Sequence, residues 1–188
     1  MRGDRFIDIF LVRHGEAAAS WGEATDPGLS ALGQRQAQAV ADELALQLPS
    51  ECHLLSSPLQ RALETAAPLA LHFGRDLDKR DAFREIPAPV PLPERPAWLR
   101  RFMQQRWSEQ EENLQAWRRT ALDQLLELDR PTAVFTHFLV INAVVGHVTG
   151  QAETLCFWPD NGSVTHLVHK GDSLELVSEG RQMQTVVN

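Results

Sequence analysis

Two histidines and two arginines in this sequence have the types and neighbours expected of a site that handles phosphate. Arg13 and His14 come directly after a short apolar run, Arg61 lies near the start of a helical pattern, and His137 follows another apolar run. Guanidinium groups hold phosphate oxygens by paired hydrogen bonds. A neutral imidazole can attack phosphorus, whereas an imidazolium cannot. Together these side chains indicate phosphoryl transfer in which one histidine, kept neutral beside the arginines, is the nucleophile.

The leaving oxygen of a phosphate ester also needs a proton. Glu85, which follows Arg84 at the edge of a proline-rich stretch, is our candidate for the acid. An exposed loop carboxylate in this place would need no function, and Glu16, Glu64 and Glu94 are alternative acids. The residues alone leave this choice open.

The apolar runs that precede these residues predict the elements that position them. Short β-rich runs over 6–12, 52–55 and 133–135 predict buried strands. Helix-start signals and helical spacing predict helices capped by Ser30 and by Ser57, the second carrying Arg61 in its first turn. A third helix is expected after His137, through Val148 to Gly150, and alternating segments over 164–168 and 174–177 predict a hairpin.

Strands that alternate with helices predict an α/β fold, which we expect to be a three-layer α/β/α single domain spanning residues 1–188 with a mostly parallel central sheet. Ligands of such sheets bind beyond the carboxyl ends of the strands. His14, Arg61 and His137 are therefore expected to converge at one end of the sheet.

The segment after Glu85 is expected to border this site. Five prolines between Ile86 and Pro96 predict an extended, semi-rigid loop, and the pattern from Ala97 to Leu128 is helical. We interpret the loop as the lining of an active-site mouth, with a proline-rich ligand for a partner domain as the alternative. The tryptophans of the helical segment, at 98, 107 and 117, are expected to be core or pocket wall.

Composition and charge exclude several classes of function. The formal net charge of −7 argues against a broad nucleic-acid or membrane surface, because both partners require a basic face. The two cysteines, Cys52 and Cys156, lack the spacing of a zinc site or a redox pair. No apolar stretch approaches the roughly 20 residues that span a bilayer, and the first residues do not resemble a signal peptide. We expect a cytoplasmic protein; its oligomeric state is not indicated.

Three motifs resemble the histidine phosphatase superfamily, which includes the phosphoglycerate mutases. They are LVRHGE at 11–16, SSPLQRALETA at 56–66 and the pair Thr136-His137, and their order and strand-helix context match over most of the chain. The stretch DPGLSALG at 26–33 also looks like the first loop and helix start of the family. The chain departs from the family at Phe138, where a glycine is usual, and it has only Ser20 near the place where many members carry Asn or Thr.

The resemblance implies a role for each candidate. His14 would be the phosphorylated nucleophile, and Glu85 matches the position of the proton donor. Arg13, Arg61 and His137 would line the phosphate pocket, and His137 is also counted among the catalytic residues. It also implies a variable insertion at about 86–117 over the active site. No cofactor and no metal is expected, because arginines and histidines supply the positive charge that a metal would supply.

The resulting hypothesis is a phosphatase that hydrolyses a small-molecule or protein phosphomonoester through a phosphohistidine intermediate on His14. One alternative is phosphoglycerate mutase-type transfer, in which the phosphoryl group returns to another oxygen of the substrate. The other is a non-catalytic phosphate-binding module, which Phe138 and the proline-rich loop would suit.

Overall fold

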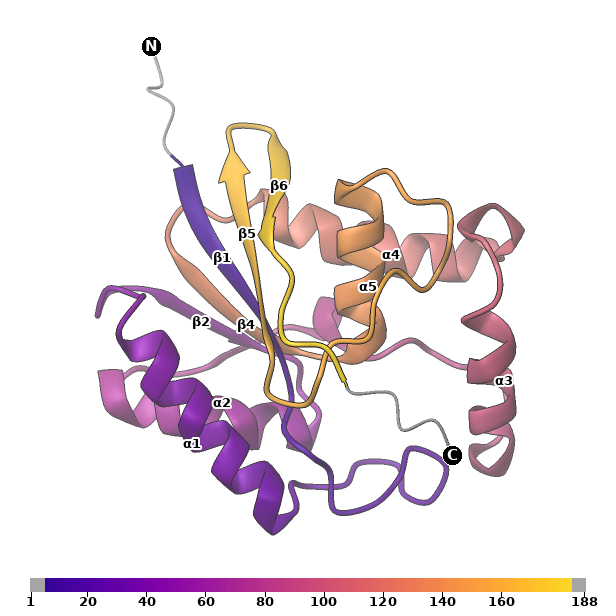
Figure 1. The fold of residues 1–188 in the computed structure, drawn as a ribbon, viewed down its shortest axis with the longest axis horizontal. Helices are drawn as coiled ribbons and strands as arrows, with labels where there is room; N and C mark the ends of the chain where they lie inside the picture. The colour runs from indigo at the N-terminus through magenta and orange to yellow at the C-terminus, as the bar shows by residue number, and fades with distance from the viewer. Residues whose placement is uncertain (1–5, 184–188) are drawn as a thin grey trace.

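A single six-stranded sheet forms the centre of the molecule, which is described over residues 6–183 by a computed structural model (Figure 1). The strands lie in the order β3 (Asp78–Lys79), β2 (His53–Ser56), β4 (Thr132–Thr136), β1 (Phe6–Arg13), β5 (Val164–Lys170) and β6 (Ser173–Ser178). The first four are parallel, whereas β5 is antiparallel to β1 and β6 is antiparallel to β5. The mostly parallel sheet and the C-terminal hairpin are thereby confirmed.

Helices cover both faces of the sheet (Figure 1). The side chains of β1 alternate: Ile9 and Leu11 pack in one core cluster with α4 (Glu112–Leu126) and α5 (Phe138–Val148). Phe10 and Val12 point the other way, into a cluster with α1 (Ala31–Ala45) and α2 (Gln60–Phe73). Because successive strand residues face opposite sides, an uninterrupted apolar strand requires cover on both faces. The predicted three-layer α/β/α domain is confirmed.

Of the two predicted helix caps, Ser30 is confirmed and Ser57 is wrong. Ser30 caps α1, its hydroxyl accepting a hydrogen bond from the amide of Gly33. The residue that precedes α2 is Leu59 and not Ser57. The hydroxyl of Ser57 instead lies 2.7 Å from a ring nitrogen of His137, so a tertiary contact replaces the predicted helix cap. Arg61 still lies in the first turn of α2, as predicted.

The region from Ala97 to Leu128 is not continuously helical. A short helix α3 (Arg95–Phe102) begins inside the proline-rich stretch, after the 3₁₀ turn η2 (Leu92–Glu94). It is separated from α4 by a loop that contains a second turn, η3 (Trp107–Glu109). In that loop the backbone bonds the segment 152–154 as well as itself, since the amide of Trp107 donates to Ala152 and the carbonyl of Gln105 accepts from Thr154. Sequence periodicity cannot reveal this tertiary pairing.

The connection that follows β3 leads to a third core cluster, which lies around α3. The turn η1 (Asp81–Phe83) leads from β3 to Glu85. Around α3, the side chains of Ile86, Phe102, Trp107 and Leu114 pack beside α5 in a cluster distinct from the two sheet cores. In Figure 1, α3 lies at the far side of α5 from the sheet. Within residues 6–183, no helix has the length and apolarity to cross a membrane.

The packing of α1 predicts a large difference between two neighbouring leucines. Leu44 is fully buried against the sheet, whereas Leu46 is 90% exposed. Leu44→Ala is expected to lower the free energy of unfolding by about 2–5 kcal/mol, because it removes buried methyl groups and leaves a cavity. Leu46→Ala, the matched control, is expected to change it by less than about 0.5 kcal/mol. Urea denaturation measures both, and equal losses would contradict the assigned register of α1.

Candidate active site

The two central parallel strands bring the two histidines together. β1 pairs with β4 in a register that sets Arg13 opposite Thr136, so His14 and His137 both lie one residue beyond the paired ends. The amide of His14 donates to the carbonyl of Thr136 at 3.1 Å, which continues the ladder by one bond. The imidazole ring centroids of His14 and His137 are 5.3 Å apart in an edge-to-face arrangement.

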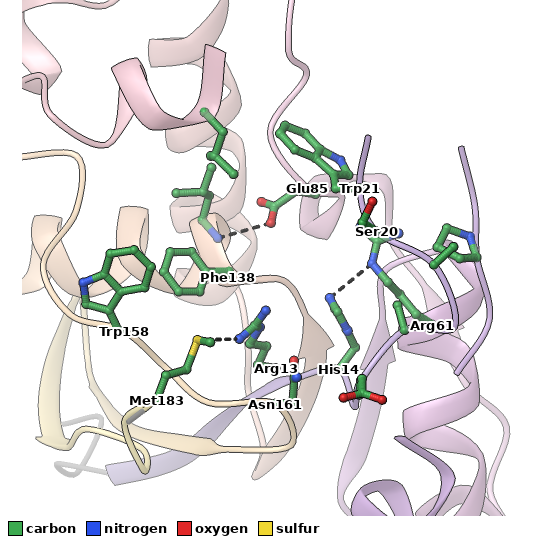
Figure 2. A pocket seen from close by; sticks show the side chains of 16 residues that line it. Arg13, His14, Ser20, Trp21, Arg61, Glu85, Phe138, Trp158, Asn161 and Met183 are labelled. Carbon is green, nitrogen blue, oxygen red and sulfur yellow. Dashed lines mark hydrogen bonds between the residues drawn. The ribbon is translucent and has the colours of Figure 1, made fainter. Parts of the chain in front are cut away.

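The hydrogen bonds of His14 define its tautomer. Its Nδ1 lies 2.7 Å from the carbonyl oxygen of Gly15, and a carbonyl can only accept, so the ring proton is on Nδ1. Nε2 accordingly carries the lone pair, which accepts a hydrogen bond from Nε of Arg61 at 3.1 Å (Figure 2). Burial, and then the charges of Arg61 and Arg13, lower the pKa of His14 to about 3. The ring is therefore neutral at physiological pH, with Nε2 available toward the cavity.

Two guanidinium groups flank this imidazole. Arg61, from the first turn of α2, is only 5% exposed. Arg13 donates to the carbonyl of Pro159 at 2.9 Å, and its guanidinium carbon lies 5.1 Å from the ring centre of Phe138. Burial is the main cause that lowers the pKa of Arg13 to about 10, so both arginines are charged at neutral pH. Over residues 6–183, neither forms an ion pair with a carboxylate, and their charge is available to an anion.

The backbone after His14 is held by a close approach and a buried hydroxyl. A Cβ atom at Gly15 would lie 2.6 Å from the carbonyl oxygen of Gly33, so the side chain has no room there. The amide of Gly15 donates to Oγ1 of Thr65 at 3.0 Å, and this hydroxyl donates to the carbonyl of Arg61 at 2.7 Å. Through Thr65, the loop that carries the imidazole is tied to the helix that carries the guanidinium.

His137 lies beneath the cavity and does not line it. It is fully buried, its Nε2 is 2.7 Å from Oγ of Ser57, and its Nδ1 has no partner within the described chain. Burial, the charge of Arg61 and the neighbouring His14 hold its pKa well below the usual value, so the ring is neutral. The structure thus places the buried ring of His137 in edge-to-face contact with the ring of His14.

Glu85 borders the same cavity as Arg61. Its two carboxylate oxygens accept hydrogen bonds from the amides of Ile86 at 3.0 Å and Leu139 at 3.3 Å, the latter in the first turn of α5. Burial raises the pKa of Glu85, and these two amides and the arginines only partly oppose the rise. Of the alternative acids, Glu16 also lines the cavity, whereas Glu64 and Glu94 do not.

These groups border one cavity of about 530 Å³. Arg13, His14, Arg61 and Glu85 surround one end of it, as Figure 2 shows. The rest is bordered by side chains that sequence reasoning did not select, namely Trp21, Leu99, Trp158 and Met183, and by Ser20, Phe138 and Asn161. Trp98, Trp107 and Trp117, expected to be core or pocket wall, lie in or against the third core cluster and outside the cavity lining. No group of three or more potential metal-ligating His, Cys, Asp or Glu side chains occurs between residues 6 and 183.

Comparison with known proteins assigns the family. The model of the histidine phosphatase superfamily, branch 1, matches residues 9–181, a range that includes both histidines, both arginines and Glu85. The chain belongs to the histidine phosphatase superfamily. Among curated relatives, it is 39% identical over 89 residues to the PE-PGRS family protein PE_PGRS11 of Mycobacterium tuberculosis, a match that covers 45% of this chain and 15% of that protein.

Solved structures share the fold of this histidine phosphatase at low identity. A mycobacterial glucosyl-3-phosphoglycerate phosphatase is 22% identical, with a TM-score of 0.72 over 92% of this chain and 98% of the other. A phosphoglycerate mutase from Bacillus anthracis is 17% identical, with a TM-score of 0.68 over 94% of this chain and 93% of the other. The resemblance to a phosphoglycerate mutase-like fold is confirmed.

The Thr65 contact predicts a coupled loss of stability and activity. Thr65→Val keeps the shape but removes the acceptor for the amide of Gly15, which is expected to cost about 1–3 kcal/mol of unfolding free energy. The released loop is also expected to lower kcat on any phosphomonoester that the protein hydrolyses. Thr120→Val is the matched control, because the exposed Thr120 likewise bonds the carbonyl four residues before it. Denaturant titration and steady-state kinetics measure both variants, and identical behaviour would show that the Gly15 contact is dispensable.

Proposed function

We propose that this histidine phosphatase hydrolyses phosphomonoesters without a metal ion, through a phosphohistidine formed on Nε2 of His14. One observation carries the proposal: a neutral imidazole, with its proton held on Nδ1 by the carbonyl of Gly15, directs Nε2 toward Arg61. Within residues 6–183, neither Arg61 nor Arg13 forms an ion pair. This combines a nucleophile with a site for a dianion.

In the first step, the phosphoryl group of the ester would lie between Arg13 and Arg61 and replace the hydrogen bond that Nε2 of His14 accepts from Arg61. Nε2 attacks phosphorus, the N–P bond forms, and the bond from phosphorus to the ester oxygen breaks. The leaving oxygen takes its proton from Glu85, whose raised pKa keeps a fraction of its carboxyl protonated. Arg13 and Arg61 stabilise the charge that spreads over the phosphoryl oxygens in the transition state.

In the second step, water attacks the phosphohistidine. Glu85, now ionised, accepts a proton from the water, the N–P bond breaks, and inorganic phosphate leaves with neutral His14 restored. The carbonyl of Gly15 serves both steps, because it stabilises the positive charge that the ring acquires when Nε2 is phosphorylated. His137, which does not line the cavity, would act as a positioning residue, because its ring contacts that of His14 edge to face.

The alternatives have less support. A mutase must retain a released intermediate until it reacts again, and within the described chain Arg13 and Arg61 are the only cationic residues that border the cavity. A non-catalytic module would need neither the fixed tautomer of His14 nor a carboxyl group of raised pKa across the cavity. The name of the mycobacterial neighbour, a phosphatase of a phosphorylated glycerate, agrees with hydrolysis of a small phosphomonoester. A cytoplasmic location remains a prediction.

The nucleophile is tested by His14→Ala with phenyl phosphate in the presence of a chelator. Loss of Nε2 is expected to lower kcat by about a thousandfold or more, whereas the wild type resists the chelator and is inhibited by vanadate. His72→Ala, which removes an exposed histidine from α2, is expected to retain full activity. Rapid quenching of the wild type should also trap acid-labile phosphate on the chain. Retained turnover in folded His14→Ala would reject the mechanism.

The acid is tested by Glu85→Gln with two kinds of ester. An alkyl leaving group needs a proton, so its kcat is expected to fall about 10²–10⁴-fold, whereas an aryl phosphate should lose less than about tenfold. Glu94→Gln, in an exposed position outside the cavity lining, is the control, and Glu16→Gln examines the rival acid. Equal losses on both esters would remove Glu85 from this role.

The pH dependence of the activity follows from the pKa values of Glu85 and His14. Glu85 must be protonated to donate, so activity on alkyl phosphates is expected to fall as pH rises through its raised pKa. His14, with a pKa of about 3, stays neutral throughout the usual range and contributes no loss of activity between pH 5 and neutrality. Profiles of kcat/KM for the wild type and Glu85→Gln measure this, and an unchanged profile in the variant would contradict the assignment.

A further inference from the structure

The end of the cavity away from His14 is bordered by aromatic and aliphatic side chains from several separate parts of the chain. Trp21 comes from the loop after β1, Leu99 from α3, and Trp158 and Met183 from the segments on either side of the β5–β6 hairpin. Phe138, at the start of α5, lies beside Trp158 with their ring centroids 5.5 Å apart. In Figure 2, Trp158, Phe138 and Met183 gather on the side of Arg13, while Trp21 lies on the side of Arg61.

Specific contacts hold this apolar wall in position. The amide of Met183 donates to the carbonyl of Trp158 at 2.8 Å, and Pro159 and Gln182 form an antiparallel bridge, so the two segments fix each other. The sulfur of Met183 accepts a hydrogen bond from Arg13 at 3.4 Å, and Phe138 lies against the same guanidinium. The wall is thereby connected to Arg13, one of the residues that would bind phosphate.

The distribution of charge in the cavity is one-sided. Its cationic residues within the described chain, Arg13 and Arg61, both lie at the phosphate end. Arg95 does not border the cavity; its guanidinium carbon lies 5.6 Å from the ring centre of Trp21, which does border it. A carboxylate in the leaving group would therefore meet no positive partner in this arrangement. Trp158 meanwhile keeps 39% of its surface exposed, although burial of such a ring is favourable.

We infer that this wall is a subsite for the leaving group, and that the preferred substrates are phosphomonoesters of uncharged aromatic or otherwise apolar alcohols. The inference rests on the proposed function and adds its substrate class. Trp158 and Trp21 are the specificity-determining residues, because their rings border the cavity without contacting the phosphate end. The chain differs in this respect from what the name of its mycobacterial neighbour implies for that enzyme, a substrate that contains a glycerate carboxylate.

The test compares esters that differ only in the part that meets the wall. Phenyl and 2-naphthyl phosphate have leaving groups of similar acidity, so a difference in kcat/KM reports binding of the second ring. The wild type is expected to prefer 2-naphthyl phosphate by about tenfold, the factor that burial of a further apolar ring contributes. Butyl phosphate is likewise expected to exceed 3-phosphoglycerate. Values of kcat/KM for phenyl and 2-naphthyl phosphate that agree within twofold would overturn the inference. A preference for 3-phosphoglycerate over butyl phosphate would also overturn it, and would point to Arg95 turning from Trp21 toward a carboxylate.

Two variants test whether Trp158 and Trp21 produce the preference for 2-naphthyl phosphate. Trp158→Ala is expected to reduce the naphthyl preference to about threefold or less, and Trp21→Ala provides a second reading if the first variant does not fold. Phe6→Ala is the matched control, because it removes another exposed aromatic side chain at a site remote from the cavity lining, and it should keep the tenfold preference. A preference that persists undiminished in both tryptophan variants would reject the subsite.

Calorimetric binding separates this inference from the proposed function. If wild-type protein binds 2-naphthyl phosphate about tenfold more tightly than phenyl phosphate but hydrolyses neither, the subsite stands and the proposed hydrolysis fails. If both esters are hydrolysed at equal kcat/KM and bound equally, the hydrolysis stands and the subsite fails. Each result is decisive for one of the two statements.

Discussion

The parallel pairing of β1 with β4 is the constraint on which the rest of the site depends. Hydrogen bonds in a parallel ladder are evenly spaced, so two strands in fixed register end at the same edge. Here Arg13 is opposite Thr136, and the next residue on each strand is a histidine. Both strands are apolar on both faces and covered by helices on both sides. A shift of register would expose the core, and the relative position of the two imidazoles is therefore fixed by packing far from either ring.

The second determinant is the buried positive charge of two arginines that form no ion pair within the described part of the chain. Arg13 and Arg61 are both lowered in pKa chiefly by burial, and the neutral imidazole between them adds no negative charge. Two unit charges about 4 Å apart at an effective dielectric constant of about 20 interact by about 4 kcal/mol. A phosphate dianion between the guanidinium groups would gain several such interactions. The cost of burying these arginines is thus offset when a phosphate binds, which explains how a chain of net charge −7 can present an anion site.

The parts of this molecule that could be foreseen are those determined by neighbouring residues. The apolar runs before His14 and His137 predict central strands, and Ser30 predicts a helix start, because periodicity and capping are local. The break between α3 and α4 could not be foreseen, since it depends on hydrogen bonds to the segment 152–154. For the same reason, Trp158 and Met183 carried no signal: their place at the cavity depends on a bridge between segments with no distinguishing motif. Phe138 was noticed as a departure from the family, but its contact with Arg13 required the structure.

The contact between Met183 and Arg13 joins side chains 170 positions apart in the chain. The strand that carries Arg13 is synthesised early, whereas Trp158 and Met183, which border the same cavity, are synthesised long after it. A nascent chain that stops before residue 158 would lack this border, although it would already contain His14, Arg61 and His137. The surroundings of Arg13 in the described fold therefore depend on residues added long after the arginine itself.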